Sequence, residues 1–242
     1  MQKNKPATHG NSSIDALSSA PIGRRKLLQT SLGVAGAAVG AAAFGSGVAR
    51  AQQCVVTPQQ TEGPFYPLDF ALGTDADLTL AEGRTAAARG DVIYVAGTVR
   101  DQNCTPVANA LVEIWQAAAS GRYNHPGDDS GLEPDPNFQG FGRVLTDSAG
   151  RYMFKTIVPG KYPAAQGWER PPHIHFKISR RGYQEMITQM YFAGDALNDR
   201  DRILRAIPAA ERASVMVTLR PPQDGMDPRS RSCVFDVAIR RL

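Results

Sequence analysis

Short runs of alternating apolar and polar residues, separated by turns rich in glycine and proline, make up most of the chain after residue 90. Such alternation predicts β-strands, because successive side chains of a strand point to opposite faces of a sheet. We expect strands at 92–100, 111–116, 143–146, 152–156, 173–176, 185–191, 214–219 and 233–239. In the second of these, Leu111, Glu113 and Trp115 fall on one face. Many short strands between turn signals indicate an all-β sandwich with little helix.

Four further segments complete this outline. Asp147 to Gly150 is a turn sequence, and we expect it to join the strands on either side of it as a hairpin. A short helix is expected at 199–207, where Pro208 ends it. Long irregular loops are expected at 117–142 and 158–172. Loops of such length in a compact domain are typically functional, and these two carry tyrosines.

The first 51 residues have the order of an export signal. Arg24 and Arg25 precede a weakly apolar alanine and glycine run, which ends at Ala49-Arg50-Ala51. This order predicts a cleaved twin-arginine signal peptide and a periplasmic or extracellular protein. The run is too short and too rich in glycine to predict a stable membrane anchor. We expect an extended arm and linker at 52–90 and one catalytic β-sandwich domain at 91–242.

The leader also accounts for the basic composition of the chain. Residues 1–51 hold six cationic side chains and one acidic one, so a total net charge of +4 leaves about −1 for residues 52–242. No footprint for nucleic acid remains. The three cysteines, Cys54, Cys104 and Cys233, have no metal-site spacing. One disulfide and one free thiol is compatible with export, and the spacing does not choose among the three pairings.

Two of the four histidines, His173 and His175, stand two apart after Pro171-Pro172. On a strand they project from one face while Ile174 packs against the other, which makes them a bidentate clamp for one metal ion. The alternative is a pair of polar residues on the solvated face of a sheet. The two prolines rule out a helix here, and Arg170 places a permanent cation beside the pair.

The loop tyrosines, Tyr123 and Tyr162, would complete a Tyr₂His₂ set. Ionised phenol is a hard anionic donor, and only a strongly charged ion would keep two tyrosines ionised at neutral pH. Such a set favours ferric iron over softer or divalent ions. Taken singly, a loop tyrosine is more often a packing residue with a solvated hydroxyl.

Sequence context supports the set. The segments GRYNH and PGKYP surround the two tyrosines, and VEIWQA, DPNFQGFGR, RPPHIHF and QMYF occur in order with them. This combination resembles the intradiol ring-cleaving dioxygenases, most closely the protocatechuate 3,4-dioxygenase subunits, from Thr57 to about Leu204. The resemblance implies a transthyretin-like (prealbumin-like) β-sandwich with long active-site loops. It also implies one non-haem Fe(III) per chain, held by Tyr123, Tyr162, His173 and His175.

The family reaction consumes a catechol-type diol and O₂, inserts both oxygen atoms and opens the ring between the hydroxyl-bearing carbons to give a cis,cis-muconate. By resemblance, Tyr162 is the tyrosinate that the substrate displaces and that takes a substrate proton. Arg170 is expected beside the ring, where it stabilises developing negative charge. Gln189 matches an active-site amide near the iron. Pro64 and Phe65 are expected ring contacts at the substrate entrance, and His125 is expected to have a supporting role.

Two departures from the family pattern stand out. The protocatechuate enzymes carry a tryptophan soon after the second tyrosine, where this chain has Pro163-Ala164-Ala165, and the following loop is shorter. The linker before residue 90 also lacks the apolar periodicity of the helical dimerisation domain found in the catechol branch. A homo-oligomer is compatible with the sequence.

Two other interpretations stay open at this point. One is an exported transthyretin-like binding module without catalysis, since a fold does not imply a function. The other is a periplasmic Zn or Cu protein that adds His125 to the histidine clamp.

Overall fold

The computed structural model describes residues 54–68 and 75–242. The predicted export signal and its cleavage point lie outside these residues. Within them, no helix is both long and apolar enough to cross a membrane.

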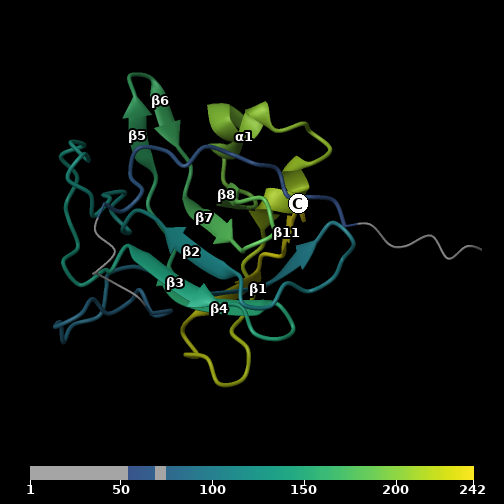
Figure 1. Ribbon diagram of the computed structural model, residues 1–242. Coiled ribbons are helices and arrows are strands. Elements are labelled where there is room, and N and C mark those ends of the chain that lie inside the picture. The colour runs from purple at the N-terminus through teal and green to yellow at the C-terminus, as the bar shows by residue number, and fades with distance from the viewer. Residues whose placement is uncertain (1–53, 69–74) are drawn as a thin grey trace, which may run out of the picture. The chain divides into compact units, whose positions relative to one another are not determined.

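Two β-sheets form the body of the protein (Figure 1). The first runs in the order β10 (Arg231–Val234), β1 (Val92–Asp101) and β11 (Val237–Ile239), with β4 (Arg151–Ile157) also paired to β1. The second runs β3 (Phe141–Leu145), β2 (Leu111–Trp115), β7 (His173–Ser179), β8 (Met186–Phe192) and β9 (Met216–Val217). Helix is confined to α1 (Arg202–Ala206) and the 3₁₀ turns η1 (Asn198–Arg200) and η2 (Arg212–Val215) among the described residues. The predicted all-β class with little helix is confirmed.

One apolar core draws side chains from both sheets. It takes Ile93 and Val95 from β1, Phe154 from β4, and Ile174 and Phe176 from β7, all fully buried. These residues alternate along their strands, as the sequence pattern predicts, because every second side chain faces the opposite sheet. The other face of β7 therefore carries His173 and His175.

The predicted hairpin at Asp147 to Gly150 is wrong. The turn itself forms, and the Gly150 N–H donates to the Asp147 carbonyl at 2.9 Å. However, β3 pairs with β2, whereas β4 pairs with β1 in the other sheet. The turn thus carries the chain from one layer of the sandwich to the other. Local turn chemistry predicts the reversal correctly, but the partners of the two strands depend on burial in a core shared by both sheets.

The segment predicted as an irregular loop at 158–172 contains a third, two-stranded sheet. It pairs β5 (Tyr162–Ala165) with β6 (Trp168–Arg170), and Figure 1 shows it projecting beyond the start of β7, on the same side as α1. The expected strand at 214–219 is mostly the turn η2 and a two-residue β9. The expected strand at 233–239 is split into β10 and β11.

A disulfide joins Cys54 to Cys104, and Cys233 is a buried free thiol. The bond ties the arm at 54–68 to the turn after β1. The arm continues across β8, where the Gln60 N–H donates to the Ile187 carbonyl at 2.8 Å. This path brings Pro64 and Phe65 over the histidine face of β7.

Candidate active site

Four side chains that are distant in the sequence converge on the outer face of β7. His173 and His175 lie on the strand with ring centroids 5.0 Å apart. The loop after β2 brings in Tyr123, whose hydroxyl lies 3.5 Å from His173 Nε2. Tyr162 begins β5, with its ring 5.3 Å from that of Tyr123 and 5.7 Å from that of His173. All four are buried, so the structure brings together the complete set predicted from the sequence.

Hydrogen bonding fixes which nitrogen of His173 faces the cluster. Its Nδ1 lies 2.7 Å from the Pro171 carbonyl oxygen, which can only accept, so Nδ1 carries the proton. The lone pair of Nε2 then points toward Tyr123 and the Arg170 guanidinium, whose Nη1 lies 3.0 Å away. Burial, reinforced by Arg170, lowers the pKa of both His173 and His175 well below the usual value. Both rings are therefore neutral and able to donate a lone pair.

Burial has the opposite effect on the two phenols. It raises the pKa of Tyr123 well above its usual value, and the pKa of Tyr162 is raised for the same reason despite the nearby Arg170 cation. Two adjacent buried phenols do not ionise unless a strong positive charge compensates for the lost solvation. A trivalent cation would supply that charge. Buried Nδ1 of His175 also has no hydrogen-bond partner among the described residues, as expected of a site whose polar atoms serve something besides protein.

The arm at 54–68 covers the site. Gly63 has φ of +74°, and a Cβ at this position would meet His175 Cε1 at 3.3 Å, so glycine permits the close approach. Phe65 stacks on Tyr123 at 4.5 Å between ring centroids. Pro64 and Phe65 line a cavity of about 300 Å³ together with Tyr162, Arg170 and His175. This volume is large enough for a small aromatic ligand.

Arg170 is almost completely buried, and every one of its donor nitrogens has a partner. Its Nε donates to Asp201 at 2.9 Å, and Nη2 donates to the Gln189 side-chain oxygen at 2.8 Å and to the Tyr191 hydroxyl at 3.1 Å. The Asp201 carboxylate is itself fully buried and also caps α1 by accepting from the Leu204 N–H. The guanidinium is therefore held rigidly beside His173 as a permanent cation.

Comparison with known proteins identifies the family. A family model described as Dioxygenase matches residues 61–240. The protocatechuate 3,4-dioxygenase beta chain of Burkholderia cepacia is 43% identical over 183 residues, which cover 73% of this chain and 76% of that protein. Catechol 1,2-dioxygenase 2 of Acinetobacter lwoffii is 31% identical over 175 residues, covering 64% of this chain and 60% of that protein. The chain belongs to the intradiol ring-cleaving dioxygenase family.

The fold agrees with this assignment. The dioxygenase domain of a dioxygenase and carbohydrate-binding fusion protein from the cellulolytic bacterium Streptomyces sp. SirexAA-E superposes with a TM-score of 0.58. It is 27% identical, and the match covers 78% of this chain and all of that domain. The expectation of a ring-cleaving dioxygenase is confirmed at the level of the family.

Within this intradiol dioxygenase, two predicted residues have structural contacts that the sequence did not reveal. Gln189 is fully buried on β8, where its Oε1 accepts from Arg170 and its Nε2 donates to the Thr61 carbonyl at 2.9 Å. It thus joins Arg170 to the arm. His125 accepts at Nδ1 from the Gly127 N–H at 3.0 Å and faces the edge of Phe65.

The described residues of the dioxygenase contain no group of three or more His, Cys, Asp or Glu side chains arranged for a metal ion. His125 therefore does not complete a three-residue site with the histidine pair. Only the tyrosine oxygens extend the pair to four donors.

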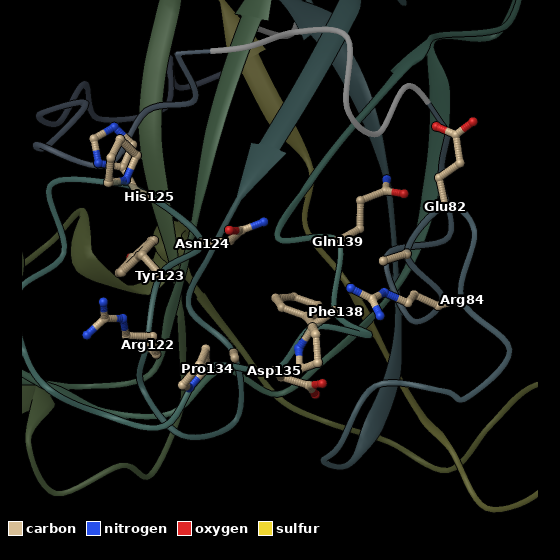
Figure 2. Close-up of a pocket in the computed structure, with 14 residues that line it drawn as sticks. Glu82, Arg84, Arg122, Tyr123, Asn124, His125, Pro134, Asp135, Phe138 and Gln139 are labelled. Atoms are coloured by element: carbon tan, nitrogen blue, oxygen red, sulfur yellow. The ribbon is translucent and has the colours of Figure 1, made fainter.

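A larger hollow of about 540 Å³ lies behind Tyr123, between its loop and the segment around residues 81–84. Figure 2 shows Arg122 and Tyr123 on one side of it, with Glu82 and Arg84 on the other. None of Tyr162, Arg170, His173 and His175 lines it. We call it the outer groove.

Sequence reasoning missed several residues of the site. Asp201 is the charge partner of Arg170, and Trp115 stacks on the His175 ring at 4.7 Å. Trp168 and Ile203 line the cavity. The predicted helix at 199–207 begins too early, and Asp201 is the N-cap of the observed helix α1, a role that its residue type favours. Its pairing with Arg170 across 31 positions leaves no local signal.

Proposed function

We propose that the protein is a non-haem Fe(III) intradiol dioxygenase, with one iron per chain, that cleaves catechol-type diols. The observation that carries the proposal is the convergence of two neutral imidazoles and two buried phenols, of which His175 and Tyr162 line the cavity. Tyr123, Tyr162, His173 and His175 would hold the metal. Hard anionic oxygens combined with imidazoles suit Fe(III) better than Zn or Cu.

Bound Fe(III) would hold the diol and make it reactive toward O₂, with the ring opening between the two hydroxyl-bearing carbons to give a cis,cis-muconate. Tyr162 lines the cavity, so its oxygen, ionised when it holds the metal, would lie beside the bound diol. We assign it as the acceptor of a substrate proton.

Arg170 would stabilise negative charge that develops on the substrate. It is preorganised by Asp201 and Gln189, so it does not reorient as the charge forms. Pro64 and Phe65, which line the cavity, would cover the ring and limit its contact with water. The substrate class, catechol, protocatechuate or a related lignin-derived diol, is supported by the names of the relatives, and O₂ is the second substrate.

We also propose export by the twin-arginine route to the periplasm or beyond, on the basis of Arg24 and Arg25. The Burkholderia relative is named a beta chain, which supports an oligomeric assembly.

Iron loading combined with isotope incorporation tests the function. Protein loaded with Fe(III), Zn(II) or Cu(II) is mixed with catechol under ¹⁸O₂, and the product is analysed by mass spectrometry. We expect about one iron per chain and a muconate that contains two ¹⁸O atoms, with iron only. One labelled oxygen, an extradiol product or equal activity with zinc would contradict the proposal.

A further inference from the structure

A second hollow adjoins the catalytic cavity across Trp168. It has a volume of about 460 Å³ and lies between the β5–β6 sheet and the start of α1. Pro163 and Trp168 line both spaces. The two hollows are therefore neighbours that share a wall, and a ligand longer than one ring could reach from the first to the second along Trp168.

Three exposed arginines dominate the second hollow, namely Arg200, Arg202 and Arg205. We call them the arginine rim. Among the described residues, none of the three has a carboxylate within ion-pair distance, and the one acidic lining residue, Glu169, pairs with Lys161 at 3.1 Å. The rim therefore presents uncompensated positive charge to the hollow.

Trp168 separates two guanidinium groups with different roles. Arg170 Cζ lies 5.9 Å from the Trp168 ring centroid on the catalytic side, and Arg202 Cζ lies 5.0 Å from the same centroid. Both cations interact with one aromatic ring. The Trp168 ring thus contacts both the buried cation of the catalytic site and one exposed cation of the rim, Arg202.

The catalytic cavity has the opposite charge pattern. Arg170 is the only cationic side chain among its described lining residues, and its donors are taken up by Asp201, Gln189, Tyr191 and His173. Asp128 and Asp129 also line this cavity, and only Asp128 has a cationic neighbour, Arg122 at 3.7 Å. A carboxylate attached directly to a substrate ring would lie near two carboxylates and a single cation, Arg170, which already pairs with Asp201.

We propose that the preferred substrates are catechols that carry a carboxylate at the end of a short side chain, with the ring in the catalytic cavity and the carboxylate at the arginine rim. The proposal rests on the proposed function and narrows its substrate class. Trp168 provides an apolar surface for the connecting carbons. The exposed arginines supply the charge that selects the anion.

Matched substrates test the proposal. Dihydroxyphenylpropanoate, a catechol whose carboxylate ends a two-carbon chain, is compared with its methyl ester, which keeps the ring and chain but removes the charge. We expect kcat/KM to favour the acid by about fivefold at low salt, and the preference to fall as salt rises, as exposed charge pairs do. Protocatechuate should be a poorer substrate than the propanoate.

Three variants test which residues cause the preference. The double variant Arg200→Gln and Arg205→Gln should bring the ratio of acid to ester close to one, whereas Arg181→Gln, an exposed arginine lining neither hollow, should leave the ratio unchanged. Asp129→Asn should raise kcat/KM for protocatechuate relative to catechol, because it removes one of the repelling carboxylates. Each ratio is internal to one enzyme, so it does not depend on the iron content of the preparation.

An unchanged acid preference in the double variant would overturn the proposal. If the double variant keeps the preference and its assembly mass in size-exclusion chromatography also changes, the arginines belong to a subunit contact instead. If the iron-loaded wild type turns over no diol, the proposed function fails. Calorimetric binding of the acid and the ester to wild type and double variant then still decides whether the rim selects the anion.

Discussion

The outer groove, which Tyr123 lines, and the cavity lined by Tyr162, Arg170 and His175 differ in the chemistry of their walls. The outer groove is the larger, at about 540 Å³ against about 300 Å³ for the catalytic cavity. Yet its lining contains mostly solvated polar residues and prolines, whereas the smaller cavity has buried His175, Tyr162 and Arg170 at its wall. Volume alone would therefore point to the outer groove as the reactive site. Buried groups with shifted pKa values, held by long-range hydrogen bonds, distinguish a reactive site from a surface depression.

Of all substitutions around the two hollows, removal of a histidine should cause the largest loss of iron and of activity. We expect His173→Ala or His175→Ala to abolish iron retention and lower kcat/KM by more than about 100-fold, because the ligand set loses a nitrogen donor. Iron content by atomic absorption, with circular dichroism to check folding, measures the effect. Full iron content in a folded variant would remove that histidine from the ligand set.

Arg170→Lys should have the next largest effect. Lysine keeps the charge but cannot reproduce the fork that contacts Asp201, Gln189 and Tyr191, so we expect kcat to fall about 10- to 100-fold while iron and colour are retained. Steady-state oxygen uptake measures the loss. Asp201→Asn, which keeps an oxygen to cap α1, is the companion variant and should also slow turnover. Unaltered kinetics in both would remove the guanidinium from the mechanism.

Removal of the disulfide should lower the stability of the protein and have little effect on the binding of substrate in the cavity. We expect the double variant Cys54→Ser and Cys104→Ser to lose about 2–4 kcal/mol in the free energy of unfolding, because the bond closes a loop of 50 residues. Urea denaturation measures this loss. The KM for catechol should change by less than about threefold, since independent hydrogen bonds hold the arm at Thr57 and Gln60. A KM effect much larger than this would mean that the bond positions Pro64 and Phe65.

Changes in the outer groove should have the smallest effect. The double variant Arg84→Ala and Asn124→Ala removes two polar groups of its wall. We expect kcat/KM to change by less than about twofold and stability by less than about 0.5 kcal/mol, as at ordinary surface positions. A loss comparable to that of Arg170→Lys would show that this groove takes part in the reaction.

The sequence predicted those features of the site that depend on neighbouring residues, and it missed those that depend on contacts between residues distant in the chain. Alternation on one strand placed His173 and His175 on one face and Ile174 in the core, and this is what the structure has. The partners of β3 and β4 were predicted wrongly because pairing is decided by a core that draws on both sheets. Asp201 and Trp168 entered the site only through tertiary packing.

The most direct test of the central claim is the visible absorption spectrum of the iron-loaded protein, recorded anaerobically before and after addition of catechol and again after air is admitted. The account predicts a red-brown band from tyrosinate to Fe(III) that shifts with catechol and recovers as a muconate forms, and that weakens in Tyr123→Phe and Tyr162→Phe. A protein that stays colourless with a full complement of iron would contradict the Tyr₂His₂ site.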